Sequence, residues 1–88
     1  MTREVVVPNA LGLHARAAAR FVQTAARFAA QIRVSRGGRI VDGKSLMGML
    51  LLAASQGSTL RIDADGSDAD AALDALAALV AAGFGEAV

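Results

Sequence analysis

Four short runs of the chain alternate between hydrophobic and polar residues, which is the pattern of a strand with one buried face. These runs are residues 3–7, 31–36, 39–41 and 59–64. Only Gly37-Gly38 separates the second run from the third, which predicts a tight hairpin turn. The first run ends at Pro8-Asn9, which predicts a loop before the next element.

Helical spacing follows that loop and begins just after His14. The apolar positions of this segment fall on one helix face: Ala18, Phe21, Val22, Ala25, Phe28 and Ala29. The opposite face carries Arg16, Arg20, Gln23 and Arg27. This pattern predicts an amphipathic helix of about three to four turns.

The last helical segment begins near Ser67, because Ser67 and Asp70 have the spacing of a capping box. Its expected buried stripe is Ala69, Leu73, Leu76, Ala77 and Val80. Gly83 is the expected end of this helix, since glycine readily adopts the left-handed conformation that follows a helix.

A short helix is also predicted after Ser45, between the other two. The predicted order is therefore strand, helix, strand, strand, helix, strand, helix. Amphipathic helices among alternating strands indicate an α+β fold, in which helices cover one face of an antiparallel or mixed sheet. A chain of 88 residues has room for one core only, so we expect a single domain spanning residues 1–88.

Composition excludes several classes of chemistry. Hydrophobic residues make up 55% of the chain, more than a disordered segment carries. The absence of cysteine excludes disulfides, thiolate metal sites and cysteine nucleophiles. Arg3 and Glu4 interrupt the N-terminus before any signal-like apolar run. No stretch reaches the roughly 18 apolar residues that a membrane helix needs. We therefore expect a soluble, cytoplasmic protein without membrane insertion.

Charge is divided unevenly along the chain, although the net charge is only +1. All nine basic residues lie between Arg3 and Arg61, a span with two acidic residues, and the other six acidic residues follow it. The division favours a basic surface for an anionic partner, with the acidic part left in solvent; a simple drift of charge along a short chain explains it equally well. RNA is a poor candidate, because no aromatic stacking platform is predicted on the strands.

His14 is the only histidine and lies in the segment Gly12-Leu13-His14-Ala15-Arg16, immediately before a helix. The N–H groups of a first helical turn lack intrahelical partners and carry partial positive charge, which favours an anion such as phosphate. Arg16 can add a charge-assisted hydrogen bond, and these positive surroundings favour a neutral imidazole. Such a ring can accept a phosphoryl group. A plain capping or packing role for His14 is the competing interpretation.

Other chemistries fit the sequence less well. One histidine without cysteine makes a poor metal site. The acidic residues cluster in the C-terminal part, and nothing ties a pair of them to His14. No glycine-rich nucleotide-binding loop is present, so another protein must supply any phosphoryl group on His14. The sequence predicts no metal and no cofactor.

The short helix after Ser45 is predicted from Leu46 to about Ala54, with Ser45 as its N-cap and Gln56-Gly57 as its end. A short helix on a small domain buries one face, yet nearly every position here is apolar. The exposed aliphatic and methionine patch that results is typical of a docking surface; burial between layers or at a homodimer interface would also explain it. A phosphate on Ser45 would lie beside this patch, although capping alone explains the serine.

The chain resembles HPr, the histidine-containing phosphocarrier family of the bacterial phosphoenolpyruvate-dependent phosphotransferase system, over essentially its whole length. The resemblance rests on Gly12-Leu13-His14-Ala15-Arg16, Gly43-Lys44-Ser45-Leu46-Met47-Gly48, Gln56-Gly57 and Gly83-Phe84-Gly85-Glu86. It implies an open-faced β-sandwich in which a four-stranded antiparallel sheet has three helices on one face, in the order βαββαβα.

The resemblance also implies a function. Enzyme I would phosphorylate His14 on a ring nitrogen using phosphoenolpyruvate, and His14 would pass the group to Enzyme IIA proteins. Ala15, Arg16 and Ala17 would hold the phosphate, and Ser45 matches the serine modified by HPr kinase/phosphorylase. The implied docking residues are Arg20, Leu46, Met47 and Leu50. Such a carrier is not an independent catalyst, and we expect a monomer because it must dock successive partners.

One position departs from the family pattern. Most sugar-transport members have proline where this chain has Ala17. Proline is favourable in the first helical turn but not required, so alanine should leave the site working. In having alanine at this position the chain is similar to proteobacterial members of the family, including those of the nitrogen-related branch. The alternative function is therefore a regulatory docking protein controlled by phosphorylation of Ser45, with little phosphoryl relay to sugar transport.

Overall fold

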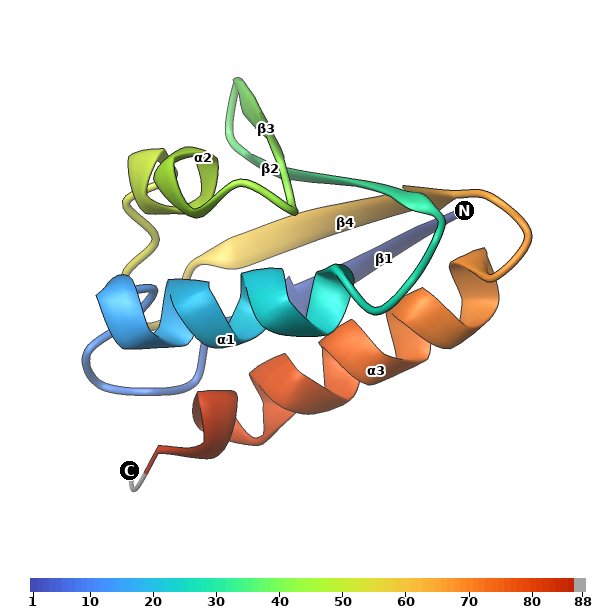
Figure 1. The fold of residues 1–88 in the computed structure, drawn as a ribbon. Coiled ribbons are helices and arrows are strands. Elements are labelled where there is room, and N and C mark those ends of the chain that lie inside the picture. The colour runs from blue at the N-terminus through green and yellow to red at the C-terminus, as the bar shows by residue number, and fades with distance from the viewer. Residues whose placement is uncertain (87–88) are drawn as a thin grey trace.

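Strands and helices alternate along the computed structural model, which describes residues 1–86 (Figure 1). The strands are β1 (Thr2–Val6), β2 (Gln31–Arg36), β3 (Arg39–Asp42) and β4 (Thr59–Asp65). The helices are α1 (Ala15–Ala25), α2 (Leu46–Leu51) and α3 (Ala69–Ala81), followed by the short 3-10 turn η1 (Gly83–Gly85). The order βαββαβα confirms the predicted fold class.

The strands form one antiparallel sheet in the spatial order β1-β4-β2-β3. Arg36 pairs with Arg39 across Gly37-Gly38, which confirms the predicted hairpin. Side chains of the central strands β2 and β4 alternate between exposed and buried, and the buried set forms the floor of the core. That set is Ile32, Val34, Leu60, Ile62 and Ala64.

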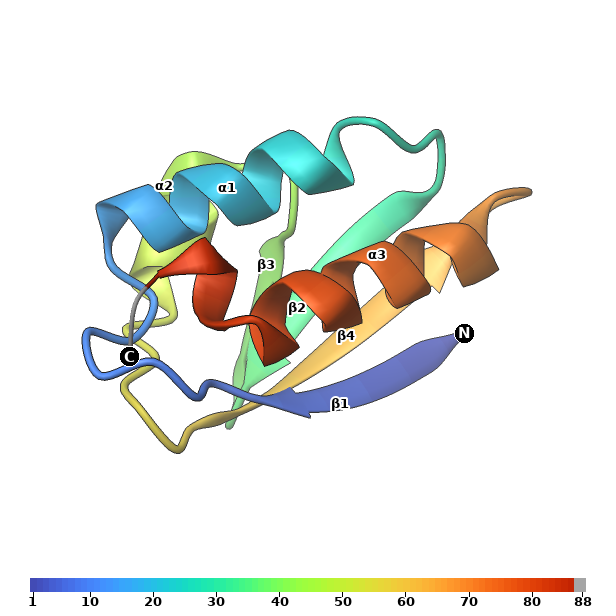
Figure 2. The same ribbon diagram turned by 90° about the horizontal axis from the view of Figure 1, so that it is seen from below.

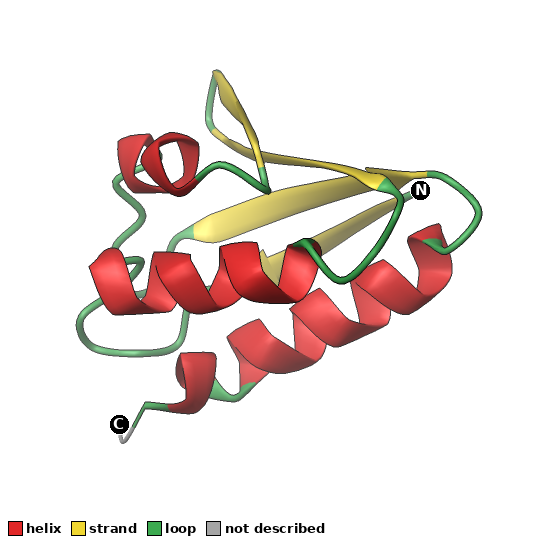
Figure 3. Ribbon diagram, viewed as in Figure 1, coloured by secondary structure: helices red, strands yellow, loops and turns green. Residues whose placement is uncertain are grey.

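Helices α1 and α3 run across one face of the sheet and leave the other face to solvent (Figures 2 and 3). Small side chains such as Ala18 and Ala25 let α1 approach the sheet closely around Phe21, which is fully buried. The predicted stripe of α3 is confirmed at Ala69, Leu73, Leu76 and Val80, whereas the predicted Ala77 is only half-buried and Ala72 is buried in addition. No helix within residues 1–86 is both long and apolar enough to span a membrane.

Two boundaries near the N-terminus differ from the predicted ones. β1 runs one residue earlier than residues 3–7, because Val7 leaves the ladder with β4 and its N–H donates to the carbonyl of Ser58 at 2.9 Å. α1 ends at Ala25 instead of extending through Phe28, whose ring still packs against the core from the following loop. The helical spacing of apolar residues therefore continues past Ala25 because the loop after α1 also packs against the core.

The predicted capping box that begins at Ser67 is wrong. α3 starts at Ala69, so its N-cap is Asp68, and the Asp68 side chain makes no capping hydrogen bond. The Asp68 carboxylate accepts instead from the N–H groups of Ala29 and Ala30, both at 2.8 Å. This contact ties the loop after α1 to the start of α3.

The contacts of Asp68 predict an acid-dependent part of the stability. Hydrogen bonds from the N–H groups of Ala29 and Ala30 hold the pKa of Asp68 below its ordinary value of 3.8. Such a group stabilises the fold above the pKa of the unfolded chain, and this contribution is lost as the pH falls through the folded value. We expect Asp68→Asn to lower the melting temperature at neutral pH, and the difference from wild type to shrink below about pH 4.

Thermal unfolding measured at several pH values tests this expectation. The exposed Asp70 lies in the first turn of the same helix, so Asp70→Asn is the matched control. A difference between wild type and Asp68→Asn that stays constant with pH would contradict the assigned role.

Candidate functional site

His14 is the N-cap residue of α1. Its backbone is extended, with φ −77° and ψ −179°, and its carbonyl accepts the N–H of Ala18 at 2.8 Å. The imidazole turns back over the start of the helix, so that Nδ1 accepts the N–H of Arg16 at 3.3 Å. The side chain remains 28% exposed. His14 is therefore a capping residue, and the capping contact orients a ring that solvent can still reach.

The loop before His14 is held by a hydrogen bond within the loop and by one to a distant part of the chain. Gly12 has a positive φ of 67°, and its carbonyl accepts Nδ2 of Asn9 at 2.8 Å. The N–H of Leu13 donates to the carbonyl of Ala54 at 2.8 Å, and the Leu13 side chain is buried. These contacts fix the point at which His14 enters the helix.

The three residues expected to hold phosphate, Ala15, Arg16 and Ala17, are the first residues of α1. N–H groups in a first turn have no carbonyl one turn earlier and are available to an anion. The Ala17 side chain is buried in the core, so this residue offers only its backbone. Arg16 is exposed and lines, with Arg20, a surface hollow of about 310 Å³ beside the turn that follows α3.

A carboxylate lies against the other side of the His14 ring. Oε2 of Glu86 is hydrogen-bonded to Nε2 of His14, and Oε1 accepts from Nδ2 of Asn9 at 2.7 Å. Asn9 is 1% exposed and the Glu86 side chain is 11% exposed, so the carboxylate is largely shielded from water. The sequence tied no pair of acidic residues to His14, and the structure brings this one carboxylate to the ring.

The turn after α3 brings Glu86 to this position. Gly83, Phe84 and Gly85 have positive φ values of 64°, 58° and 77°, so the chain reverses where Gly83 was predicted to end the helix. Phe84 is fully buried, and Nη1 of Arg20 donates to its carbonyl at 2.5 Å. Arg20, predicted on the exposed face of α1, is therefore only partly exposed. Figure 2 shows η1 beside the first turn of α1.

The neighbours of Glu86 determine the tautomer of the His14 ring. Burial alone would raise the pKa of Glu86, but hydrogen bonds to His14 and Asn9 bring it below the ordinary value of 4.5. A charged carboxylate only accepts hydrogen bonds, so Nε2 carries the proton. Nδ1 accepts the N–H of Arg16 and so carries the lone pair. The nitrogen with the lone pair therefore lies on the side of the helix N-terminus.

Helix α2 carries the exposed apolar patch that the sequence predicted. Leu46, Met47 and Leu51 are 44%, 69% and 54% exposed. Leu50, which was expected among the exposed docking residues, is only partly exposed and packs against the core. Met49 is fully buried and marks the inner side of this short helix. The apolar patch therefore consists of Leu46, Met47 and Leu51.

Ser45 caps α2 as predicted, because its Oγ accepts the N–H of Gly48 at 3.0 Å. α2 ends at Leu51 instead of at the predicted Ala54. Ala53, which lies just beyond the helix, takes a positive φ of 50°. α2 packs against α1 and β3, and the carbonyl of Ala54 holds the loop before His14. The apolar patch and His14 therefore lie at the same end of the molecule (Figure 1).

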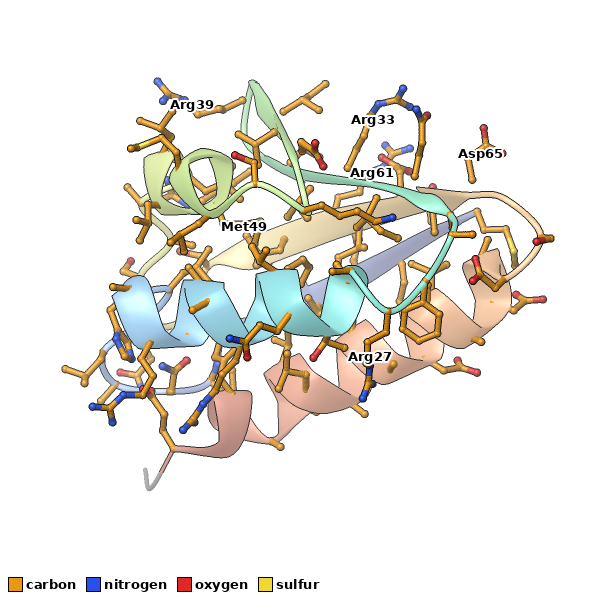
Figure 4. The ribbon with its side chains drawn as sticks, in the orientation of Figure 1. Arg27, Arg33, Arg39, Met49, Arg61 and Asp65 are labelled. Carbon is orange, nitrogen blue, oxygen red and sulfur yellow. The ribbon has the colours of Figure 1, made fainter. Side chains whose placement is uncertain are left out.

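The uneven charge of the sequence does not become a single basic surface. Arg33 and Arg61 lie on the sheet face away from the helices, whereas Arg39 lies beside α2 and Arg27 at the end of α1 (Figure 4). Arg61 is also 3.5 Å from a carboxylate oxygen of Asp63. Within residues 1–86, no group of three or more histidine, cysteine or acidic side chains comes together that could hold a metal ion.

Comparison with known proteins identifies a matching family profile and close relatives of this chain. Residues 1–82 match the sequence profile described as PTS-HPr, "PTS HPr component phosphorylation site". The chain is 50% identical over 86 residues to the phosphocarrier protein HPr of Cupriavidus necator, covering 98% of this chain and 97% of that protein. It is 44% identical over 87 residues to the phosphocarrier protein NPr of Shewanella violacea, covering 99% and 96%. The crystal structure of HPr-C-His from Thermoanaerobacter tengcongensis superposes with a TM-score of 0.95 at 41% identity, covering 100% and 99%.

The fold and these relatives define the class as a phosphocarrier protein, which relays a phosphoryl group and is not an independent catalyst. The chain belongs to the HPr family of the phosphotransferase system. Relatives named HPr and NPr both align over nearly the whole chain.

Proposed function

We propose that His14 accepts a phosphoryl group from Enzyme I, which takes it from phosphoenolpyruvate, and passes it to Enzyme IIA proteins. One observation carries the proposal: the ring presents Nδ1 at the N-terminus of α1 while Nε2 faces Glu86. A nucleophile beside helix N–H groups suits phosphoryl transfer, because the negative oxygens must be held while phosphorus changes partner. Membership of the HPr family supports the relay.

In the accepting step, the lone pair of Nδ1 forms the bond to phosphorus. The bond between phosphorus and the donor atom breaks, and its electron pair leaves with the donor. The N–H of Arg16, which donates to Nδ1 before transfer, then becomes available to a phosphoryl oxygen. The N–H groups of Ala15 and Ala17 and the guanidinium of Arg16 supply further donors.

Mass spectrometry of the chain after incubation with Enzyme I and phosphoenolpyruvate tests this proposal. We expect one acid-labile phosphoryl group per chain, and none when Enzyme I is left out. No modification by an Enzyme I that is active on another carrier would overturn the relay. That result would favour the alternative function, a docking protein controlled through Ser45.

The docking surface in this proposal combines the start of α1 with the apolar patch of α2. Leu46 and Met47 supply adaptable apolar contacts, and Arg16 and Arg20 supply positive charge for acidic partners. Leu51 contributes more exposed area than Leu50, which packs inward.

Phosphorylation of Ser45 by a kinase of the HPr kinase/phosphorylase type would regulate this docking surface. Aspartate and serine are both good N-cap residues, so Ser45→Asp should keep α2 folded while placing a negative charge beside the apolar patch. We expect Ser45→Asp to weaken binding of Enzyme I several-fold by repulsion from an acidic partner surface. Calorimetry or kinetics with Enzyme I measures the effect.

Ser45→Ala provides the matched control for that prediction. It removes the hydrogen bond to Gly48 and should lower the stability by about 1 kcal/mol without adding charge. Enzyme I kinetics that are the same for Ser45→Asp and wild type would contradict regulation through this residue.

A further inference from the structure

We infer that Glu86 is a positioning residue of the phosphoryl relay, which keeps the His14 proton on Nε2 and balances the positive charge that the ring gains on phosphorylation. The inference rests on the function proposed above. It assigns a role to a residue 72 positions away from His14 in the chain, in the turn that follows α3.

The carboxylate of Glu86 is held at both of its oxygens. Oε2 contacts Nε2 of His14, and Oε1 accepts from Nδ2 of Asn9 at 2.7 Å. The same Nδ2 also donates to the carbonyl of Gly12 at 2.8 Å, in the loop that leads to His14. The buried Asn9 amide therefore fixes the carboxylate relative to that loop. Glu86 is thus oriented toward the ring before any partner binds.

The charge of the ring changes during the relay. The form of the ring that can attack phosphorus is the neutral one, with a proton on Nε2 and a lone pair on Nδ1. When Nδ1 bonds to phosphorus, the proton stays on Nε2 and the ring becomes a cation. A carboxylate in hydrogen-bond contact and largely shielded from water stabilises such a cation more than an exposed one would.

The same proton matters when the phosphoryl group leaves. As the bond between Nδ1 and phosphorus breaks, its electron pair returns to Nδ1. With Nε2 protonated, the leaving group is neutral imidazole; without that proton it would be an imidazolide anion, a far poorer leaving group. By holding the proton, Glu86 keeps phosphorylated His14 in the form that transfers its group onward.

The other charged groups at this end of the site cannot substitute for Glu86. Arg16 and Arg20, from α1, line the hollow beside it and are both cations, so they disfavour a positive ring. Within residues 1–86, Glu86 is the acidic residue in contact with His14.

Two substitutions separate the hydrogen bond from the charge. Glu86→Gln keeps an oxygen that can accept from Nε2 but removes the negative charge, and Glu86→Ala removes both. Asp65→Asn makes the same charge change at the end of β4, far from the start of α1, and is the control (Figure 4). Nitrogen-15 NMR of the unphosphorylated ring reports its tautomer, and stopped-flow assays with Enzyme I and an Enzyme IIA report both transfer steps.

We expect Glu86→Gln to keep the Nε2–H tautomer but to slow acceptance from Enzyme I about tenfold, because the cation that forms on acceptance then has a neutral hydrogen bond in place of a charged one. Glu86→Ala should in addition shift the ring toward the Nδ1–H tautomer and slow acceptance from Enzyme I further. Asp65→Asn should behave as wild type in every assay.

Acceptance from Enzyme I at the wild-type rate by Glu86→Gln, or an unchanged tautomer in Glu86→Ala, would overturn the inference while leaving the relay intact. A phosphoryl group on Nε2 of the wild type would also overturn it, because Glu86 would then face the reacting nitrogen. Wild type that takes up no phosphoryl group would instead overturn the proposed function, and this inference with it.

Discussion

Replacing His14 with asparagine should abolish phosphoryl uptake from Enzyme I while leaving the chain folded. Asparagine is among the best N-cap residues, so its side-chain oxygen can take over the hydrogen bond from the N–H of Arg16. Its amide nitrogen has no available lone pair and cannot attack phosphorus. Mass spectrometry should find no phosphorylated chain, and thermal unfolding should place the variant within about 1 kcal/mol of wild type.

Arg16→Ala is the comparison for that experiment. The Arg16 side chain is exposed and offers only hydrogen-bond donors to the transferred oxygens, so its loss should slow phosphorylation about tenfold without preventing it. If His14→Asn still accepted a phosphoryl group from Enzyme I, another residue would be the acceptor and the proposed function would be wrong.

The parts of the molecule that follow from local chemistry could be predicted from the sequence. The hairpin at Gly37-Gly38 and the cap at Ser45 depend on residues a few positions apart, and both are confirmed. The placement of His14 at a helix start is of the same kind, since the loop, the cap and the helical spacing are adjacent in the chain.

Contacts between distant segments account for what the sequence did not predict. Asp68 looked like part of a local capping motif, but its carboxylate is taken by N–H groups from the loop after α1. Glu86 reaches His14 only because Gly83, Phe84 and Gly85 reverse the chain after α3, and no periodicity reports such a reversal. Local propensity is decided within one turn, whereas these pairings depend on how whole elements pack.

The apolar patch of α2 shows the same limit. Composition required some apolar side chains of this helix to be exposed, and that much is confirmed. Which ones are exposed depends on the rotation of α2 against α1 and β3, which the helix's own sequence does not determine, because nearly all its positions are apolar. Leu50 therefore turned inward where exposure was predicted, and Leu51 turned outward.

Substituting alanine for Gly12 should destabilise the fold by about 2–5 kcal/mol and also slow phosphoryl uptake. Gly12 has a φ of 67°, a conformation that L side chains rarely adopt. A Cβ at this position would lie 2.5 Å from the carbonyl oxygen of Ala54 and 2.9 Å from Cα of Ser55. Both obstacles are backbone atoms, so relief requires the loop before His14 to move. The clash should therefore displace His14 as well as strain the fold.

Gly37→Ala isolates the effect of the clash. Gly37 has nearly the same φ, 60°, but no heavy atom lies within 4 Å of its added Cβ. Both variants share the strain of a positive φ, roughly 1–2 kcal/mol, and the loss of glycine's freedom in the unfolded chain, so these contributions cancel in the comparison. Denaturant unfolding should show Gly12→Ala less stable than Gly37→Ala, and only Gly12→Ala should accept phosphate slowly. If the two variants were equally stable and accepted phosphate equally fast, the loop would accommodate the added Cβ without moving His14. The contact with Ala54 would then not fix the position of His14.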